Sequence, residues 1–241
     1  MRRLFSERRK AQSGVAVWLR RTLWLPLAVM AYLLLAASWA WLNADALLAQ
    51  APRASRALLS QRQAAILLRV EDPDFLTHHG LSMVPGQGLA TISSALARDL
   101  FLYGARLEGA AGALQSLYRG VFDCCKRIDL GRDVMALVVD AKLSKARQLA
   151  LYADGVYMGT QDGAQVHGLP DAALRYAGKP LAQLDDQEFI ALVAMIKAPN
   201  GYHPSKAPLE HARRAARIAA LVAGRCQPDG WLDTAFDHCD R

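Results

Sequence analysis

The longest apolar run in the chain covers residues 22–42, which include no charged side chain. A helix rises about 1.5 Å per residue, so this run can cross the roughly 30 Å hydrocarbon core of a bilayer. Tryptophans, whose rings favour the membrane interface, stand near both of its ends: Trp24, Trp39 and Trp41. The pattern predicts one transmembrane helix. The alternative is a cleaved signal peptide, but the 21-residue polar lead before the run favours a retained anchor.

After this run, apolar side chains recur at intervals of three and four residues, which is the period of an amphipathic helix. No segment alternates convincingly with period two, and β-branched residues are sparse. We therefore predict a mainly α-helical domain without internal repeats. Loops are expected over residues 71–85 and 154–168, which contain prolines or glycines. Helices are expected over residues 43–69, 88–103, 112–122, 133–152, 170–176, 185–197 and 208–223.

The formal net charge of +7 is concentrated at the N-terminus. Residues 1–21 carry seven basic and one acidic side chain and account for +6, which leaves +1 for the other 220 residues. Basic residues that flank an apolar span stay in the cytoplasm. The charge is thus a topology signal and gives no reason to expect nucleic acid as a partner. We expect a cytoplasmic tail over residues 1–21, a membrane anchor over 22–42 and an extracytoplasmic domain over 43–241.

The four cysteines all lie in the expected extracytoplasmic domain. In an oxidising compartment Cys226 and Cys239 could close a C-terminal loop. The adjacent Cys124 and Cys125 cannot easily pair with each other. There is no C-x-x-C spacing and the six histidines are scattered, so no metal site is predicted and the cysteines are interpreted as structural.

Residues 71–80 place acids, an aromatic ring and two histidines in one turn with the sequence EDPDFLTHHG. Alone, an acidic cluster beside a helix is most often a cap or a solvated loop. This segment, however, fits every fixed position of E-D-x-x-F-x-x-H-x-G, the first motif of glycosyltransferase family 51, and it resembles that family. The residues at the fixed positions are Glu71, Asp72, Phe75, His78 and Gly80.

Four more segments resemble later motifs of the same family, and they follow in the same order. Residues 88–101, with Thr91 and Arg98, are similar to G-G-S-T-I-T-Q-Q-L-A-K-N-L-F. The other three are residues 143–159, similar to L-S-K…Y-L-N-x-x-Y-x-G; residues 167–179, similar to Y-G-V-E-A-A-A-x-x-Y-F-G-K; and residues 184–204, similar to L-x-x-x-E-A-A-L-L-A…A-P-x-x-Y-x-P. The resemblance covers residues 71–204, nearly the whole expected domain.

The resemblance implies an all-α, lysozyme-like glycosyltransferase domain behind a single N-terminal transmembrane helix. It implies polymerisation of lipid II into glycan strands on the outer face of a bacterial inner membrane. Lipid II, the growing strand, the membrane and other cell-wall synthesis proteins are the expected partners. A divalent cation, Mg²⁺ or Mn²⁺, at the pyrophosphate is compatible with the chemistry, although no residue demands one.

Glu71 is the residue expected to take the proton from the acceptor hydroxyl, because burial raises the pKa of a carboxyl group toward neutrality. Cations are expected to stabilise the charge that develops on the pyrophosphate leaving group. Those predicted for this task are Arg98, Lys126, Arg127 and Arg132. The other residues predicted to bind substrate are Asp72, Phe75, His78, Gly80 and Thr91.

The second catalytic acid of the family, in R-K-x-x-E, is displaced in this chain. Counting back from Lys145 puts Arg132 at its position, and a shift of one residue lets Asp133 act as the acid. The tandem glutamines of the second motif are Ser94 and Ala95 here, and only residues 81–87 separate the first two motifs, a shorter stretch than in the family. Two alternatives therefore stay open: a non-catalytic relative that binds lipid II or acts as a scaffold, and a glycan-cleaving enzyme of lysozyme type.

Overall fold

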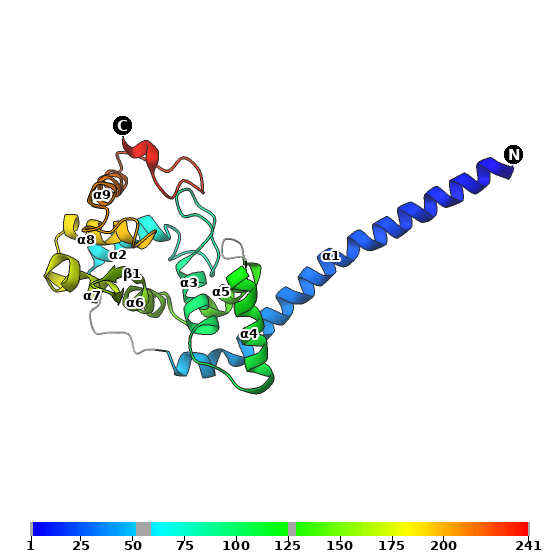
Figure 1. The fold of residues 1–241 in the computed structure, drawn as a ribbon, viewed down its shortest axis with the longest axis horizontal. Helices are drawn as coiled ribbons and strands as arrows, with labels where there is room; N and C mark the ends of the chain where they lie inside the picture. The colour runs from blue at the N-terminus through cyan, green and yellow to red at the C-terminus, as the bar shows by residue number, and fades with distance from the viewer. Residues whose placement is uncertain (1, 52–58, 125–128, 241) are drawn as a thin grey trace.

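The computed structural model describes residues 2–51, 59–124 and 129–240, and the side chains of the first range from Trp24 onward. One long helix leads into a globular body made mainly of helices (Figure 1). The elements are α1 Arg2–Ala49, α2 Gln61–Glu71, α3 Ile92–Leu96, η1 Ala97–Leu102, α4 Gly109–Cys124, α5 Leu130–Lys142, α6 Lys145–Gly155, β1 Tyr157–Gln161, β2 Ala164–His167, α7 Leu169–Ala172, η2 Ala173–Ala177, η3 Leu181–Gln183, α8 Asp186–Ile196, α9 Pro208–Val222 and η4 Asp237–Asp240.

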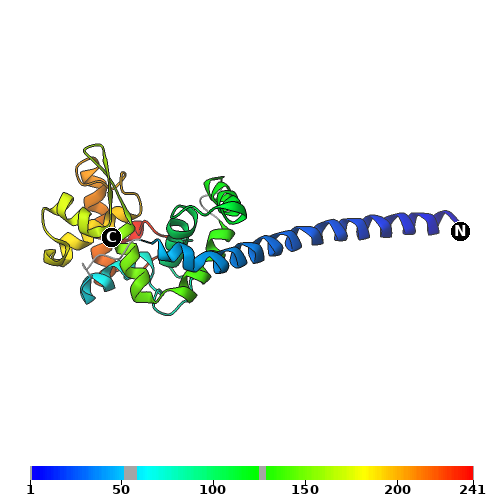
Figure 2. The same ribbon diagram turned by 90° about the horizontal axis from the view of Figure 1, so that it is seen from below.

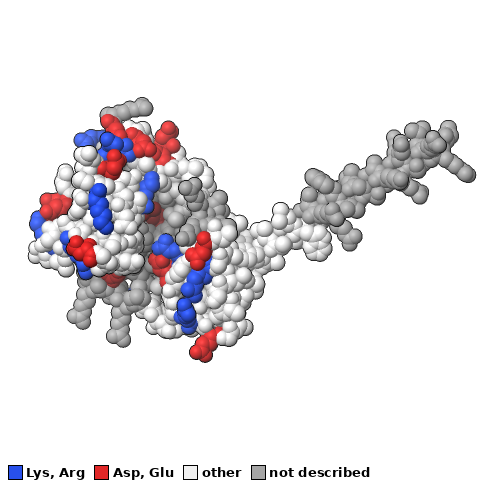
Figure 3. Space-filling model, in the orientation of Figure 1, with Lys and Arg blue, Asp and Glu red and all other residues white. Residues whose placement is uncertain are grey.

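The N-terminal half of α1 projects far from the body in both ribbon views (Figures 1 and 2). The segment Trp24–Ala49 is long and apolar enough to cross a membrane. From Trp24, where its side chains are described, α1 carries no charged residue before Asp45, whereas acids and bases are mixed over the body (Figure 3). These properties fit the predicted single transmembrane helix.

The second half of α1 is part of the globular core. Ala36 and Ala40 are fully buried, and the indole Nε1 of Trp39 donates a hydrogen bond of 3.0 Å to the carbonyl oxygen of Ala111 in α4. Lys142 at the end of α5 lies over the Trp41 ring, 4.6 Å from its centroid. Helix α1 thus contacts the globular body before residue 42. The expected boundary between membrane anchor and extracytoplasmic domain at residue 42 stays a prediction.

Capping side chains divide two of the expected helices. The helix predicted over residues 43–69 is α1 and α2, because Ser60 and Gln63 form a reciprocal capping box that starts α2. The helix predicted over residues 133–152 is α5 and α6, because the Ser144 side chain accepts a hydrogen bond from the Arg147 backbone and starts α6. Both predictions rested on the spacing of apolar residues, which does not reveal the capping residue that starts a new helix.

A β-hairpin occupies the loop expected over residues 154–168. Strands β1 and β2 pair antiparallel, and Asp162 and Gly163, both with positive φ, form the turn between them. The expected helix over 88–103 begins later, where Thr91 and Ser94 cap α3, and it continues as the π-helical turn η1. The other expected helices are confirmed within a few residues, with 112–122 lying inside the longer α4 and 170–176 divided between α7 and η2.

The C-terminal segment packs back onto the body beside residues 85–88. Cys226 and Cys239 form a disulfide, as the sequence suggested. The backbone N–H of Gly86 donates to the carbonyl oxygen of Gly230 at 3.0 Å, and that of Gly88 donates to Trp231 at 2.8 Å. Figure 1 shows the C-terminal segment, in red, beside the loop that precedes α3.

Candidate functional site

A cleft of about 740 Å³ opens at the C-terminal end of α2. Its lining includes Glu71, the last residue of that helix, and three cationic side chains from separate elements. These cations are Arg132 of α5, Lys197 directly after α8, and Arg214 of α9. Among the described residues that line the cleft, one carboxyl group therefore faces side chains whose charge is otherwise positive.

Glu71 is held in a state close to half-ionised at neutral pH. Burial raises the pKa of its carboxyl group from 4.5 to about 7, although Arg214 opposes the shift. The Tyr152 hydroxyl donates a hydrogen bond of 3.3 Å to Glu71 Oε2, which also favours the ionised form. A carboxyl group with such a pKa can both accept and release a proton near pH 7.

Arg214 is a buried cation that the sequence analysis did not single out. Its Nε donates to the Ala194 carbonyl oxygen at 3.0 Å, and Nη1 donates to the Thr234 carbonyl oxygen at 2.9 Å. The guanidinium also lies over the Phe236 ring, 5.5 Å from its centroid. A signal was available, because Arg214 falls on the apolar stripe of α9 with Ile218 and Leu221. A charged residue at such a position needs a polar partner inside the protein.

Arg132 and Asp133 lie together at the start of α5. Arg132 lines the cleft and is buried, and its Nε donates to Asp133 Oδ1 at 2.9 Å. Burial raises the pKa of the Asp133 carboxyl group, and Arg132 opposes that shift. Asp133 itself is not part of the cleft lining. The structure thus places Asp133, the predicted second acid, next to the cleft, where it forms an ion pair with Arg132.

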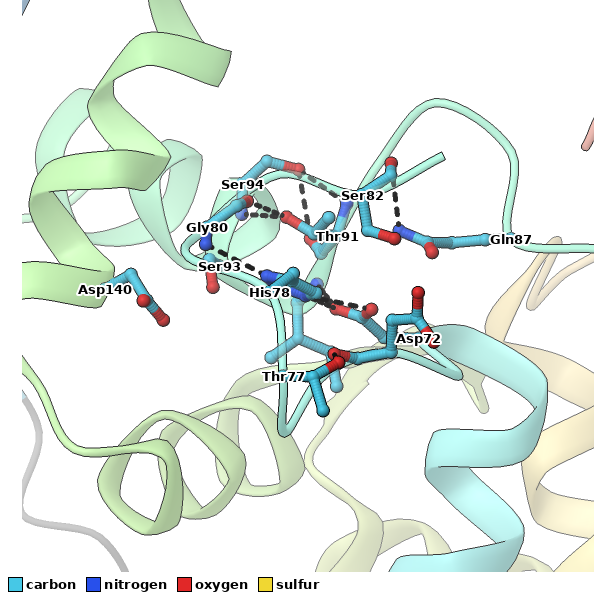
Figure 4. Close-up of polar contacts among 12 residues, drawn as sticks. Asp72, Thr77, His78, Gly80, Ser82, Gln87, Thr91, Ser93, Ser94 and Asp140 are labelled. Atoms are coloured by element: carbon cyan, nitrogen blue, oxygen red, sulfur yellow. Dashed lines mark hydrogen bonds and ion pairs between the residues drawn. The ribbon is translucent and has the colours of Figure 1, made fainter. Parts of the chain in front are cut away.

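A buried hydrogen-bond network holds the turn that follows Glu71 (Figure 4). His78 Nδ1 accepts from the Gly80 backbone N–H at 2.9 Å, so the ring proton sits on Nε2 and is donated to Asp72 at 3.0 Å. Asp72 is fully buried and also accepts from the Ile92 backbone N–H at 2.8 Å. These side chains fix α2 against α3 and do not line the cleft.

Gly80 and Thr91 continue the same framework. The Thr91 hydroxyl donates to the Gly80 carbonyl oxygen at 2.7 Å while also capping α3. Gly80 has φ +98°, and a Cβ atom there would lie 2.6 Å from the carbonyl oxygen of Ala136 in α5. Only glycine fits this close approach without a shift of the backbone.

Replacing Gly80 by alanine is therefore expected to lower the free energy of unfolding by about 1–3 kcal/mol, from backbone strain and the clash with α5. Thermal or urea unfolding of Gly80→Ala measures the effect. Gly155→Ala is the matched control, because a Cβ there meets nothing within 4 Å and its φ is not positive. Equal stability of the two variants would contradict the role assigned to Gly80.

The remaining predicted residues lie elsewhere. Phe75 is 1% exposed and packs beneath Lys145 and beside His78, so its ring belongs to the core. Arg98 forms an ion pair of 2.6 Å with Asp99 and lines a separate pocket of about 350 Å³. Lys126 and Arg127 lie outside the described residues. Of the predicted substrate-binding residues that the structure describes, only Arg132 lines the Glu71 cleft, because the others are committed to the framework or face another pocket.

The cleft does not fit a divalent metal ion. Mg²⁺ and Mn²⁺ prefer several oxygen ligands, and here one carboxyl group is set among three cations. Within the described residues, no cluster of three or more His, Cys, Asp or Glu side chains is suited to a metal.

The fold and the cleft define a mainly α-helical domain with one carboxyl group on a cationic cleft. The family model described as Transglycosylase matches residues 53–223, which is more than half of the chain. The chain therefore belongs to the transglycosylase family, glycosyltransferase family 51.

Curated relatives agree with this membership. Penicillin-binding protein 1B of Escherichia coli is 33% identical over 145 residues, which cover 59% of this chain and 16% of that protein. The protein of the same name from Vibrio cholerae is 32% identical over 65% of this chain and 19% of its own length. The biosynthetic peptidoglycan transglycosylase of Rhodospirillum centenum is 29% identical over 68% of each chain. This chain thus spans less than a fifth of the two penicillin-binding proteins that it matches.

Proposed function

We propose that this protein is a membrane-anchored peptidoglycan glycosyltransferase that polymerises lipid II, with Glu71 as the general base. The observation that carries the proposal is the placement of a carboxyl group with a pKa of about 7 on a cleft lined by three cations. Family membership supports the reaction class.

The charges of the cleft match the steps of glycosyl transfer. Ionised Glu71 takes the proton of the acceptor hydroxyl as its oxygen attacks C1 of the donor sugar. The bond from C1 to the lipid pyrophosphate breaks, and negative charge grows on the phosphate oxygens. Arg132, Lys197 and Arg214 stabilise that charge, since fixed cations in a partly water-excluded cleft need little reorganisation.

The apolar helix α1 gives the site access to a substrate that stays in the bilayer. Its segment Trp24–Ala49 fits a membrane span, and its second half packs against α4 and α5 of the domain. Confinement to the membrane surface raises the effective concentration of enzyme and lipid substrate. We infer that the N-terminus lies in the cytoplasm and the domain outside the inner membrane, following the basic tail.

Purified full-length protein incubated with labelled lipid II tests the proposal, with finished glycan as a second substrate. Glycan chains formed from lipid II support it. Binding of lipid II without any product would favour the scaffold alternative. The ion pair of Asp133 with Arg132 is a reason to test that alternative, because it engages the predicted second acid. Release of soluble fragments from finished glycan would instead identify a cleaving enzyme of lysozyme type.

Replacing Asp133 by asparagine tests the second acid. If Asp133 acts in the reaction, Asp133→Asn should lower the polymerisation rate by about 10²-fold or more, because a catalytic acid or base contributes on that scale. Asp129→Asn is not a suitable control, since Asp129 caps α5. Asp123→Asn on the exposed end of α4 is the better comparison. Unchanged activity in Asp133→Asn would remove that residue from the mechanism.

A further inference from the structure

Gln87 presents an unpaired acceptor on the wall of the Glu71 cleft. Gln87 lines the cleft, yet the residue is only 7% exposed. The carboxamide Nε2 donates a long hydrogen bond of 3.5 Å to the carbonyl oxygen of Ser82 (Figure 4). The oxygen Oε1 is buried and has no hydrogen-bond partner among the described residues.

An unpaired buried acceptor is uncommon, because burial removes its bonds to water and nothing replaces them. The other buried polar atoms without a partner in the described part of the chain lie away from this cleft: Tyr32 Oη, Tyr118 Oη and His203 Nε2. Of these four residues, Gln87 alone belongs to the lining of the cleft that contains the proposed base. A ligand that donates a hydrogen bond there would satisfy an atom that the folded chain leaves unsatisfied.

The C-terminal segment holds Gln87 in this position. Both neighbours of Gln87 are pinned through their backbone N–H groups, Gly86 to Gly230 at 3.0 Å and Gly88 to Trp231 at 2.8 Å. Both glycines have positive φ, and a Cβ at Gly86 would lie 2.5 Å from Pro228. A side chain at position 86 would therefore clash with the Pro228 ring.

Further contacts hold the ends of the same segment. The Cys226–Cys239 disulfide closes it, and Arg217 of α9 donates to Asp240 at 2.7 Å and also pairs with Asp237. This segment lies beyond residue 223, where the match to the family model ends. It also adds Leu232 and Thr234 to the cleft lining.

We propose that Gln87 is a substrate-binding residue, whose Oε1 accepts a hydrogen bond from a hydroxyl or acetamido N–H of the substrate sugar. We include in this proposal that the disulfide-closed segment 226–239 positions Gln87. The inference rests on the proposed glycosyltransferase function, and it assigns Gln87 no role in proton transfer.

Replacing Gln87 by methionine removes the acceptor and keeps the length of the side chain. The loss of one neutral hydrogen bond is expected to raise KM for lipid II about three- to tenfold, with kcat within about twofold. Gln183→Met is the matched control, since Gln183 is exposed and is not part of the cleft lining. An unchanged KM in Gln87→Met, or a loss confined to kcat, would overturn the proposal.

A binding measurement separates this inference from the proposed reaction. Lipid II is titrated in detergent micelles into full-length Glu71→Gln protein and into the double variant Glu71→Gln/Gln87→Met. The double variant is expected to bind about three- to tenfold more weakly. If wild-type protein forms no glycan but this difference remains, the proposed reaction fails and the role of Gln87 stands. Equal binding overturns the role of Gln87, whatever the activity.

A spectroscopic readout leaves Gln87 unmutated, in case Gln87→Met does not fold. Adding lipid II to isotope-labelled Glu71→Gln protein is expected to shift the side-chain amide signals of Gln87, while those of Gln183 stay in place. Shifts at neither residue would overturn the proposal.

The positioning role is tested with Cys226→Ser/Cys239→Ser and with dithiothreitol on the wild type. The dithiol gives two electrons and two protons to the disulfide, so that two thiols and a cyclic disulfide result. We expect faster hydrogen exchange at the Gly86 and Gly88 amides and a KM raised in the same direction as in Gln87→Met. Unchanged exchange and KM after loss of the disulfide would remove the C-terminal segment from the proposal.

Discussion

Replacing Glu71 by glutamine is expected to lower the rate of glycan polymerisation from lipid II by about 10²–10⁴-fold at pH 8, because a general base contributes on that scale. The glutamine keeps the shape of the side chain and can still accept from Tyr152, but it cannot take a proton. Rates measured with labelled lipid II check this result. Glu210→Gln on the exposed face of α9 is the control and should keep wild-type activity. Comparable activity in both variants would exclude Glu71 as the base.

The wild-type rate should also depend on pH through the ionisation of this group. Burial raises the pKa of Glu71 to about 7, so the fraction of ionised base, and with it the rate, should rise with pH through that midpoint. Glu71→Gln should lack this step in whatever activity remains. A rate that is flat between pH 6 and 8 in the wild type would argue against Glu71 as the titrating base.

The same pKa shift predicts a change in stability with the opposite trend. The folded state binds the Glu71 proton more tightly than the unfolded state, whose carboxyl group titrates near 4.5. Its contribution is therefore fully present below pH 4.5 and is lost as the pH rises to about 7. Because Glu71→Gln has no such loss, its free energy of unfolding relative to wild type should improve over this range, by roughly 3 kcal/mol. A stability difference between variant and wild type that stays the same from pH 4.5 to pH 8 would contradict the burial argument.

The motif residues that could be recognised from the sequence are of two physical kinds. Glu71 lies on the cleft, whereas Asp72, His78 and Gly80 build the turn that positions it. A linear motif records which residue types occur together, and it does not distinguish a side chain that meets the substrate from one that holds the backbone. The raised pKa of Glu71 depends on burial by segments distant in sequence, so only the fold can reveal it.

The cations of the cleft illustrate the other limit of sequence reasoning. Arg98 was predicted from its place in a motif, yet it pairs with Asp99 on a separate pocket. Lys197 and Arg214 come from the C-terminal half of the domain and reach the cleft because α8 and α9 pack together and against α2. Apolar periodicity predicted those helices well, but the pairing of helices is a tertiary property that no local pattern encodes.

Removing the Asp72 carboxylate is expected to have the largest effect on stability. Asp72 is fully buried and accepts hydrogen bonds from the His78 ring and the Ile92 backbone. In Asp72→Ala both donors stay buried without a partner, and α2 loses its tie to the N-terminal end of α3. A loss of about 3–5 kcal/mol in the free energy of unfolding is expected, because each buried donor left without a partner costs about 1–3 kcal/mol. Urea unfolding followed by circular dichroism measures it.

The two adjacent histidines provide a matched control for this network. The His78 side chain is 6% exposed and bonds to Asp72, whereas that of His79 is 97% exposed and lies 3.7 Å from Asp140. His78→Ala should therefore destabilise the domain in the same direction as Asp72→Ala, and His79→Ala should be nearly neutral. Because both substitutions in the pair remove the same hydrogen bond, Asp72→Ala/His78→Ala should cost less than the sum of the single effects. Additive effects would mean that the two side chains stabilise the turn independently, and the network that fixes Glu71 on the cleft would have to be assigned differently.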